Sequence, residues 1–219
     1  CAELEALLKE APENESALRY LADLYERRGE FEEAAALLRR LAELARGPQT
    51  RNDLGLRAAF ALRDAGDLRS ALGLVKTLVD REPDLDSLAL YVEIARAIGD
   101  DFELGAALER AALAGRHNPT IAAEMWVEAA QAAARTGNTS LALLRAQRAT
   151  ASDATSAEAQ LFARGLEYRE RAAGTPTDAE RTLAELAKIA GDLADEDVAL
   201  GAFLRAAALV VLGRTREAR

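Results

Sequence analysis

The strongest constraint on the fold is a glycine that recurs every 33 to 39 residues. A small residue follows five positions later in every period except the third, where Gly105 stands one position further along. A fixed period of this length indicates stacked helical hairpins, because each repeat buries its apolar face against the next one. The glycines are Gly29, Gly66, Gly99, Gly137, Gly174 and Gly213, and the other small residues are Ala34, Ala71, Ala142, Ala179 and Ala218.

The first complete period, residues 15–46, predicts two helices. Apolar residues recur three and four positions apart in its first half, which is the spacing of one helix face. Gly29 is expected to end this helix, because glycine tolerates the left-handed conformation at a helix C-terminus. Acidic residues at 30–33 then fit the first turn of a second helix. We expect Gly47 and Pro48 to close the hairpin. The apolar positions are Leu18, Leu21, Leu24 and Tyr25, then Ala34, Leu37, Leu38 and Leu41.

This pattern resembles the tetratricopeptide repeat (TPR) family. The matching residues in the first period are Leu18, Leu21, Ala22, Tyr25, Ala34, Leu38 and Leu41, and Trp126 falls where the family's tryptophan belongs. The third period fits only if Asp101 is an extra residue in the turn. The resemblance implies an all-α solenoid of antiparallel hairpins wound into a right-handed superhelix. Other two-helix repeats, such as the shorter Sel1-like kind, remain an alternative.

The whole chain is then expected to be a single array. The hairpins are placed at about residues 15–46, 52–83, 85–117, 120–152 and 156–191, with half-hairpins at 1–12 and 195–219. In the fifth hairpin, Thr177 and Glu180 form a capping box. Asn118 and Pro119 predict a helix start, with asparagine as the cap and proline in the first turn. The half-hairpins suggest a slice of a longer bacterial repeat protein, or alternatively two natural end caps.

Composition and charge exclude several classes of function. The net charge of −9 disfavours nucleic-acid binding, which requires positive charge. The single cysteine, Cys1, excludes an internal disulfide and a cysteine metal cluster. Apolar runs are all shorter than the roughly 20 residues that span a membrane. A lipidated Cys1 would indicate a bacterial lipoprotein, but a chain boundary is the simpler interpretation, so the compartment, cytoplasmic or periplasmic, stays open.

No pattern in the sequence predicts catalysis, a cofactor or a metal. His117 is the only histidine and falls in a predicted turn, where it is expected to lie at the surface. Acidic pairs precede or open predicted helices, where they complement the helix dipole. The glycines are spread one per hairpin and form no phosphate-binding loop. We therefore predict a protein that is not an enzyme, unless a catalytic domain lies outside these residues.

The resemblance implies that the first helices line a concave groove that binds a peptide or a partner protein. Phe60 is the sharpest candidate in it, either as an exposed anchor or as part of the core. Arg19 could grip a C-terminal carboxylate as in some family members, but Asp23 would repel one, so a ligand of mixed or modestly basic character is expected. The candidates are Arg19, Tyr20, Asp23, Arg27, Arg57, Phe60, Asp64, Leu90, Glu93, Ala97, Glu128, Gln131 and Arg135.

The apolar segment 198–212 suggests a second function. It is apolar around most of its circumference, which indicates burial on several sides. Either a following hairpin covers it or the chain self-associates through it, as a homodimer or a larger bacterial envelope or motility assembly. The residues expected in this contact include Leu200, Phe203, Leu204, Val210 and Val211.

Overall fold

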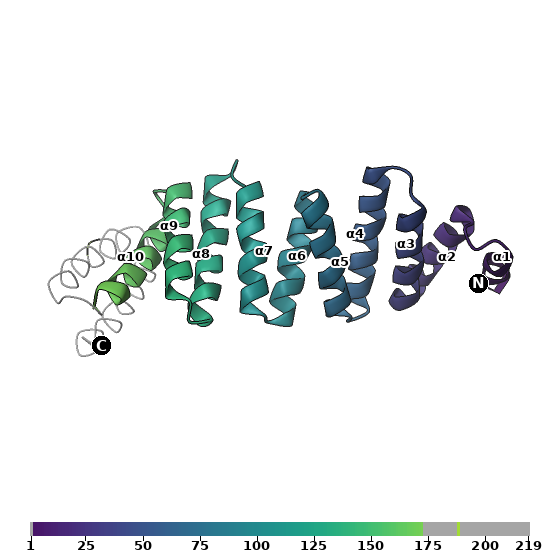
Figure 1. The fold of residues 1–219 in the computed structure, drawn as a ribbon, viewed down its shortest axis with the longest axis horizontal. Helices are drawn as coiled ribbons and strands as arrows, with labels where there is room; N and C mark the ends of the chain where they lie inside the picture. Colours follow the sequence, from purple (N-terminus) through teal and green to yellow (C-terminus); the bar gives the residue numbers. More distant parts are fainter. Residues whose placement is uncertain (1, 173–187, 189–219) are drawn as a thin grey trace. The chain divides into compact units, whose positions relative to one another are not determined.

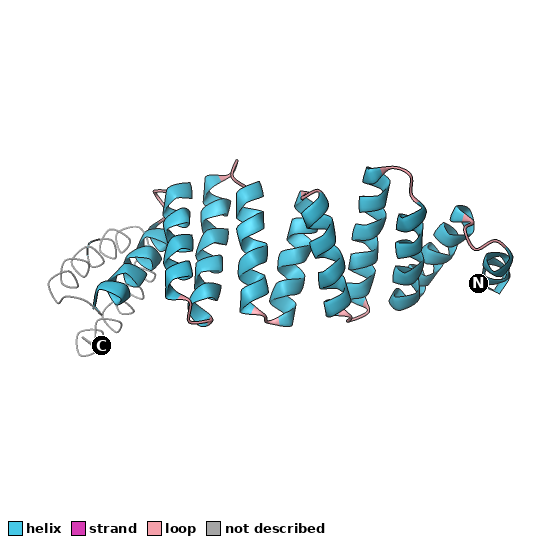
Figure 2. Cartoon of the chain, in the orientation of Figure 1, coloured by secondary structure: helices cyan, strands magenta, loops and turns pink. Residues whose placement is uncertain are grey.

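A computed structural model describes residues 2–172 and residue 188, and every described element is an α-helix (Figures 1 and 2). Short turns join the helices, and no strand is present in this part of the chain. The all-helical prediction is therefore confirmed. The helices are α1 (Ala2–Glu10), α2 (Glu15–Arg28), α3 (Phe31–Leu44), α4 (Pro48–Asp64), α5 (Leu68–Arg81), α6 (Leu85–Ile98), α7 (Asp101–Ala114), α8 (Pro119–Arg135), α9 (Thr139–Ser152) and α10 (Ala157–Ala172).

The helices form two compact units, Cys1–Asp100 and Asp101–Arg219, which we call unit 1 and unit 2. In unit 1 each helix from α1 to α5 packs against the next one along the chain, and α4 also touches α6. In unit 2 the same holds from α7 to α10, and α8 also touches α10. Figure 1 shows these consecutive helices side by side within each unit. This succession of packed neighbours is the arrangement expected of a helical repeat.

Two predicted helix ends have the expected local geometry. Gly29 has a φ of 75°, in the left-handed region, and its N–H donates to the Glu26 carbonyl at the end of α2. At the start of α8, the Asn118 side chain accepts a hydrogen bond from the Ile121 N–H at 3.3 Å, and Pro119 occupies the first turn. Both ends follow from local chemistry alone, because only nearby backbone groups take part.

The prediction that Gly47 and Pro48 close the first hairpin is wrong. Gly47 is the N-cap of α4 and Pro48 lies in its first turn, so the pair begins a helix. Proline fits there because its fixed φ suits a helix and its missing N–H would have no partner in the first turn. The first helix of the second hairpin consequently begins at 48 rather than at 52.

The third hairpin contains no extra turn residue. Residues 99 and 100 separate α6 from α7, just as residues 29 and 30 separate α2 from α3. The fourth residue of α3, α5 and α9 is a buried alanine, but the fourth residue of α7 is the buried Leu104. Gly105 follows it, facing the guanidinium of Arg145. The irregularity is therefore a different side-chain arrangement, not a longer turn.

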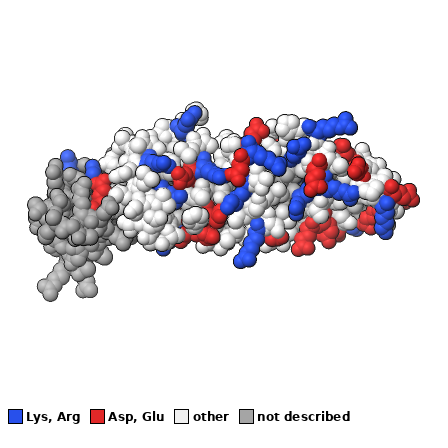
Figure 3. All heavy atoms as spheres, in the orientation of Figure 1, with Lys and Arg blue, Asp and Glu red and all other residues white. Residues whose placement is uncertain are grey.

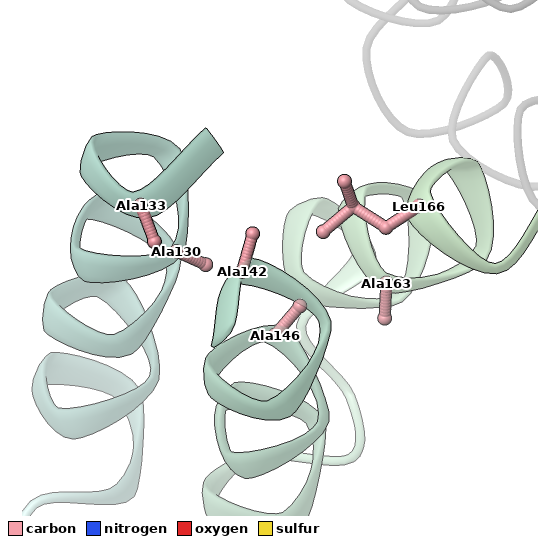
Figure 4. Close-up of a cluster of buried hydrophobic side chains, with 6 residues drawn as sticks. All are labelled: Ala130, Ala133, Ala142, Ala146, Ala163 and Leu166. Atoms are coloured by element: carbon pink, nitrogen blue, oxygen red, sulfur yellow. The ribbon is translucent and has the colours of Figure 1, made fainter. Parts of the chain in front are cut away.

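Alanine supplies much of the buried surface. One cluster in unit 2 joins three helices through small side chains and one leucine (Figure 4). Small residues allow close approach of helix backbones, which explains how a chain with only 5% aromatic residues forms a packed interior. The cluster comprises Ala130 and Ala133 from α8, Ala142 and Ala146 from α9, and Ala163 and Leu166 from α10.

Three predictions fall outside the described residues. They are the capping box at Thr177 and Glu180, most of the second helix of the fifth hairpin, and the apolar segment 198–212. The self-association residues Leu200, Phe203, Leu204, Val210 and Val211 belong to this last segment.

Candidate functional site

The predicted groove residues of unit 1 lie on α2, α4 and α6, the first helices of its hairpins. Ion pairs join α2 to α4 and α4 to α6, so these three helices share one face of the unit. We call it the first-helix face. Acidic and basic side chains lie next to one another over the described surface (Figure 3). The question is which of these charges remain open to a ligand.

Arg57 is already occupied by neighbouring carboxylates. Its guanidinium reaches from α4 to Asp23 and Glu26 on α2, with a 2.9 Å hydrogen bond from Nε to Glu26. The hydrogen bonds that Arg57 donates to the Glu26 carboxylate raise the Arg57 pKa above its ordinary value, and the one that it donates to Asp23 acts in the same direction. Arg57 and Asp23 thus connect two hairpins. Glu26 was missed from the sequence, although it lies one helical turn after Asp23.

Phe60 also has a contact within unit 1. It is partly buried, and the guanidinium carbon of Arg63 lies 5.0 Å from the centroid of its ring. Arg63 in turn forms ion pairs with Asp64 at 2.7 Å and with Glu93 of α6 at 3.1 Å. The hydrogen bond from Arg63 to Asp64 raises the Arg63 pKa. Arg63 therefore covers the ring of Phe60 on its outer side. Arg63 lies one helical turn after Phe60 and was not among the residues predicted from the sequence.

Arg19 and Tyr20 remain open. Arg19 lines a cavity of about 360 Å³ where the start of α2, the end of α3 and the start of α4 meet. Arg46 and Glu15 line the same cavity, and none of these three has a hydrogen bond or ion pair with any described residue. Tyr20 is 69% exposed, the second most exposed position among the described large aromatic residues. An exposed aromatic side chain beside open charges is a typical protein contact.

The remaining candidates of unit 1 differ in exposure. Arg27 is exposed and, like Arg19, has no partner among the described residues. Ala97 is exposed on α6, whereas Leu90 is buried, with 1% exposure. Leu90 therefore belongs to the interior and has no surface to offer a ligand.

In unit 2 the candidates Glu128, Gln131 and Arg135 all lie on α8. Glu128 and Gln131 are partly buried and Arg135 is exposed. Arg135 donates to Asp101 at the start of α7, at 2.6 and 2.9 Å. This hydrogen bond lowers the Asp101 pKa and raises the Arg135 pKa. The pair joins α7 to α8, so Arg135 also has a partner within its own unit.

The described residues show no arrangement for metal binding. No group of three or more His, Cys, Asp or Glu side chains in this part of the chain could hold a metal ion. His117 is exposed in the turn between α7 and α8. Among the described helices, none is long and apolar enough to cross a membrane. What the site offers is a surface of exposed side chains.

Comparisons with known proteins show which proteins have a similar sequence or fold. The tetratricopeptide repeat family model matches residues 2–52. No curated protein matches the chain in sequence. A crystal structure of a tetratricopeptide repeat protein from Parabacteroides merdae has a similar fold, with a TM-score of 0.53 and 15% identity, over 93% of this chain and 75% of that one. At this identity the likeness shows the fold. The match at residues 2–52 and the similar fold of the solved structure both support a tetratricopeptide repeat fold for this chain.

Proposed function

We propose that the first-helix face of unit 1 binds a segment of a partner protein without catalysing a reaction. Tetratricopeptide repeats generally mediate protein–protein interaction and are typically not enzymes. The observation that carries the proposal is Tyr20, which is 69% exposed one residue from Arg19 and its cavity. Aromatic side chains are among the groups that dominate interface energies.

The open charges define the ligand. Arg19 and Arg46 line the cavity together with Glu15, so a segment with charges of both signs fits it. The sequence analysis expects a ligand of mixed or modestly basic character, which requires acidic side chains such as Asp23 and Glu93 to be available to it. Both are paired within the unit, with Arg57 and Arg63, so they contribute little net field to a ligand.

The test removes the open groups and leaves the bridging ones intact. A double variant, Arg19→Ala with Tyr20→Ala, is compared with the parent chain as bait in a lysate of the source organism. Partners that it loses are then titrated against purified protein. We expect the loss of Tyr20 to cost about 1–2 kcal/mol, roughly five- to thirtyfold in affinity.

A matched control carries Arg69→Ala and Leu144→Ala, which remove an exposed arginine and an exposed apolar side chain on second helices. The control is expected to bind like the parent, and both variants should keep the parental helicity. If the Arg19 and Tyr20 variant binds every partner as tightly as the control does, this face is not the binding site.

A further inference from the structure

A second cavity in unit 1 lies away from the predicted groove. It has a volume of about 380 Å³ and lies between α3 and α5, the second helices of their hairpins, with α4 beneath. This volume is within the range of about 300–1,000 Å³ typical of ligand pockets. We call it the second-helix groove. No predicted site residue lines it.

The floor of this groove is apolar. Leu74 and Leu78 of α5 line it, together with Gly55 of α4. A Cβ added to Gly55 would lie 2.9 Å from a methyl carbon of Leu78, so the missing side chain at 55 lets Leu78 settle against α4. Leu74 is partly exposed, so an aliphatic side chain of a ligand could pack on it, whereas Leu78 is buried beneath the groove.

The rim carries three arginines and one glutamate. Arg39 comes from α3, Arg51 from α4 and Arg81 from α5, and Glu43 is the one acidic residue lining the groove. This excess of positive charge contrasts with a chain whose net charge is −9. The rim is therefore electrostatically complementary to an acidic ligand.

The rim arginines form no ion pair with a carboxylate of the described residues. Arg39 and Arg81 form no hydrogen bond or ion pair with any described residue, and neither does Glu43. Arg51 donates to the Ala45 carbonyl at 2.9 Å, a neutral acceptor that leaves its charge uncompensated. Guanidinium groups bind carboxylates through paired hydrogen bonds, so three of them around one cavity favour a ligand with several carboxylates.

We propose that the second-helix groove binds an acidic segment of a partner protein, with glutamate or aspartate side chains at the arginines and an aliphatic side chain on Leu74. This surface is separate from the first-helix face, so either proposal can fail alone. If both proposals hold, unit 1 binds two different partners, one at the first-helix face and one at the second-helix groove.

The probe is a fluorescent peptide of alternating glutamate and leucine, with a counterpart in which glutamine replaces every glutamate. Binding to the full chain is measured by fluorescence anisotropy at low and at physiological salt. We expect the glutamate peptide to bind more tightly, and salt to weaken it, because exposed charges are screened. Arg39→Ala and Arg81→Ala are each expected to weaken binding about three- to fivefold.

Two further variants separate the groove from general attraction. Thr77→Trp fills the cavity without changing any charge, and Thr77 is exposed, so the helix should tolerate it. It is expected to abolish binding. Arg19→Ala with Arg46→Ala removes two arginines from the other cavity and should leave affinity within twofold.

Three results would overturn the proposal. The two peptides could bind equally, or the Arg19 and Arg46 variant could lose as much affinity as the rim variants. Alternatively, sedimentation could show that the chain alone self-associates and that Arg39→Ala and Arg81→Ala together abolish it. The groove would then be occupied by a second copy of this chain.

Discussion

Gly105 offers the sharpest test of the packing described above. Glycine lowers helix stability relative to alanine by about 1 kcal/mol, so Gly→Ala inside a helix usually stabilises. At position 105, however, a Cβ would overlap Nη1 of Arg145 and lie 3.3 Å from its Cζ. Arg145 is only 6% exposed and its guanidinium is hydrogen-bonded to Glu109 and to the Ala129 carbonyl, so moving it away from the new Cβ would disturb these contacts.

The magnitude follows from the bonds that Arg145 makes. Its guanidinium donates to the Ala129 carbonyl at 3.1 Å and to Glu109 at 3.0 and 3.3 Å. A hydrogen bond involving a charged group contributes about 1.5–3 kcal/mol. Losing one of them outweighs the helix propensity gained, so Gly105→Ala should destabilise unit 2 by about 0.5–2 kcal/mol.

Gly73 provides the matched control. It also lies inside a helix, α5, but a Cβ there would have no atom within 4 Å. Gly73→Ala should therefore stabilise the chain by up to about 1 kcal/mol. Unfolding in urea is followed by circular dichroism for both variants and by Trp126 fluorescence for Gly105→Ala, because the single tryptophan lies in α8 of unit 2.

A double-mutant cycle isolates the clash. In an Arg145→Ala background, Gly105→Ala should become stabilising, because the obstructing guanidinium is gone. Glu109 keeps an ion pair with Arg148 at 2.7 Å, so this background leaves no bare carboxylate behind. If Gly105→Ala stabilises the parent chain as much as Gly73→Ala does, the guanidinium does not occupy that position and the reasoning fails.

Two further predictions concern the ends of helices in unit 2. Asn118→Ala removes the cap of α8 and should cost about 0.5–2 kcal/mol by Trp126 fluorescence, whereas Asn118→Asp, which keeps a side-chain acceptor, should not. Arg135 lowers the Asp101 pKa below its ordinary 3.8, so Asp101 contributes stability above that pH, and the contribution is lost as pH falls through its lower folded-state pKa. Asp101→Asn should therefore be less stable than the parent near pH 7. The urea midpoints of the two proteins should converge as pH falls through the folded-state pKa of Asp101, and a gap unchanged by pH would contradict the pairing.

The fold can be predicted from the sequence where a local residue pattern is typical of only one structure. Gly29 ends α2 and Asn118 begins α8, as predicted, because left-handed backbone and side-chain capping depend on residues within a few positions. Gly47 and Pro48 misled the prediction because glycine and proline occur both after helix ends and at helix starts. The direction of such a signal depends on the helices around it.

The candidate site was less predictable, because openness depends on contacts between distant residues. Arg57 and Arg19 both lie on first helices and look equivalent in the sequence. Arg57 meets Asp23 and Glu26, which are 34 and 31 residues earlier, whereas Arg19 has no described partner. Periodicity identifies the face on which a side chain lies, but not whether a neighbouring hairpin brings a carboxylate to it.

The pairing of charges separates two roles of arginine in unit 1. Arg57 and Arg63 bind carboxylates on adjacent first helices, so any ligand must compete with contacts already made within the protein. Arg39 and Arg81 lie on second helices and meet no carboxylate among the described residues. Because an ion pair in the free protein lowers the gain from forming a new one, binding energy should concentrate where arginines are unpaired. This argument favours Arg19 over Arg57 on the first-helix face, and it supports the proposal that the second-helix groove binds an acidic ligand despite the acidic character of the chain.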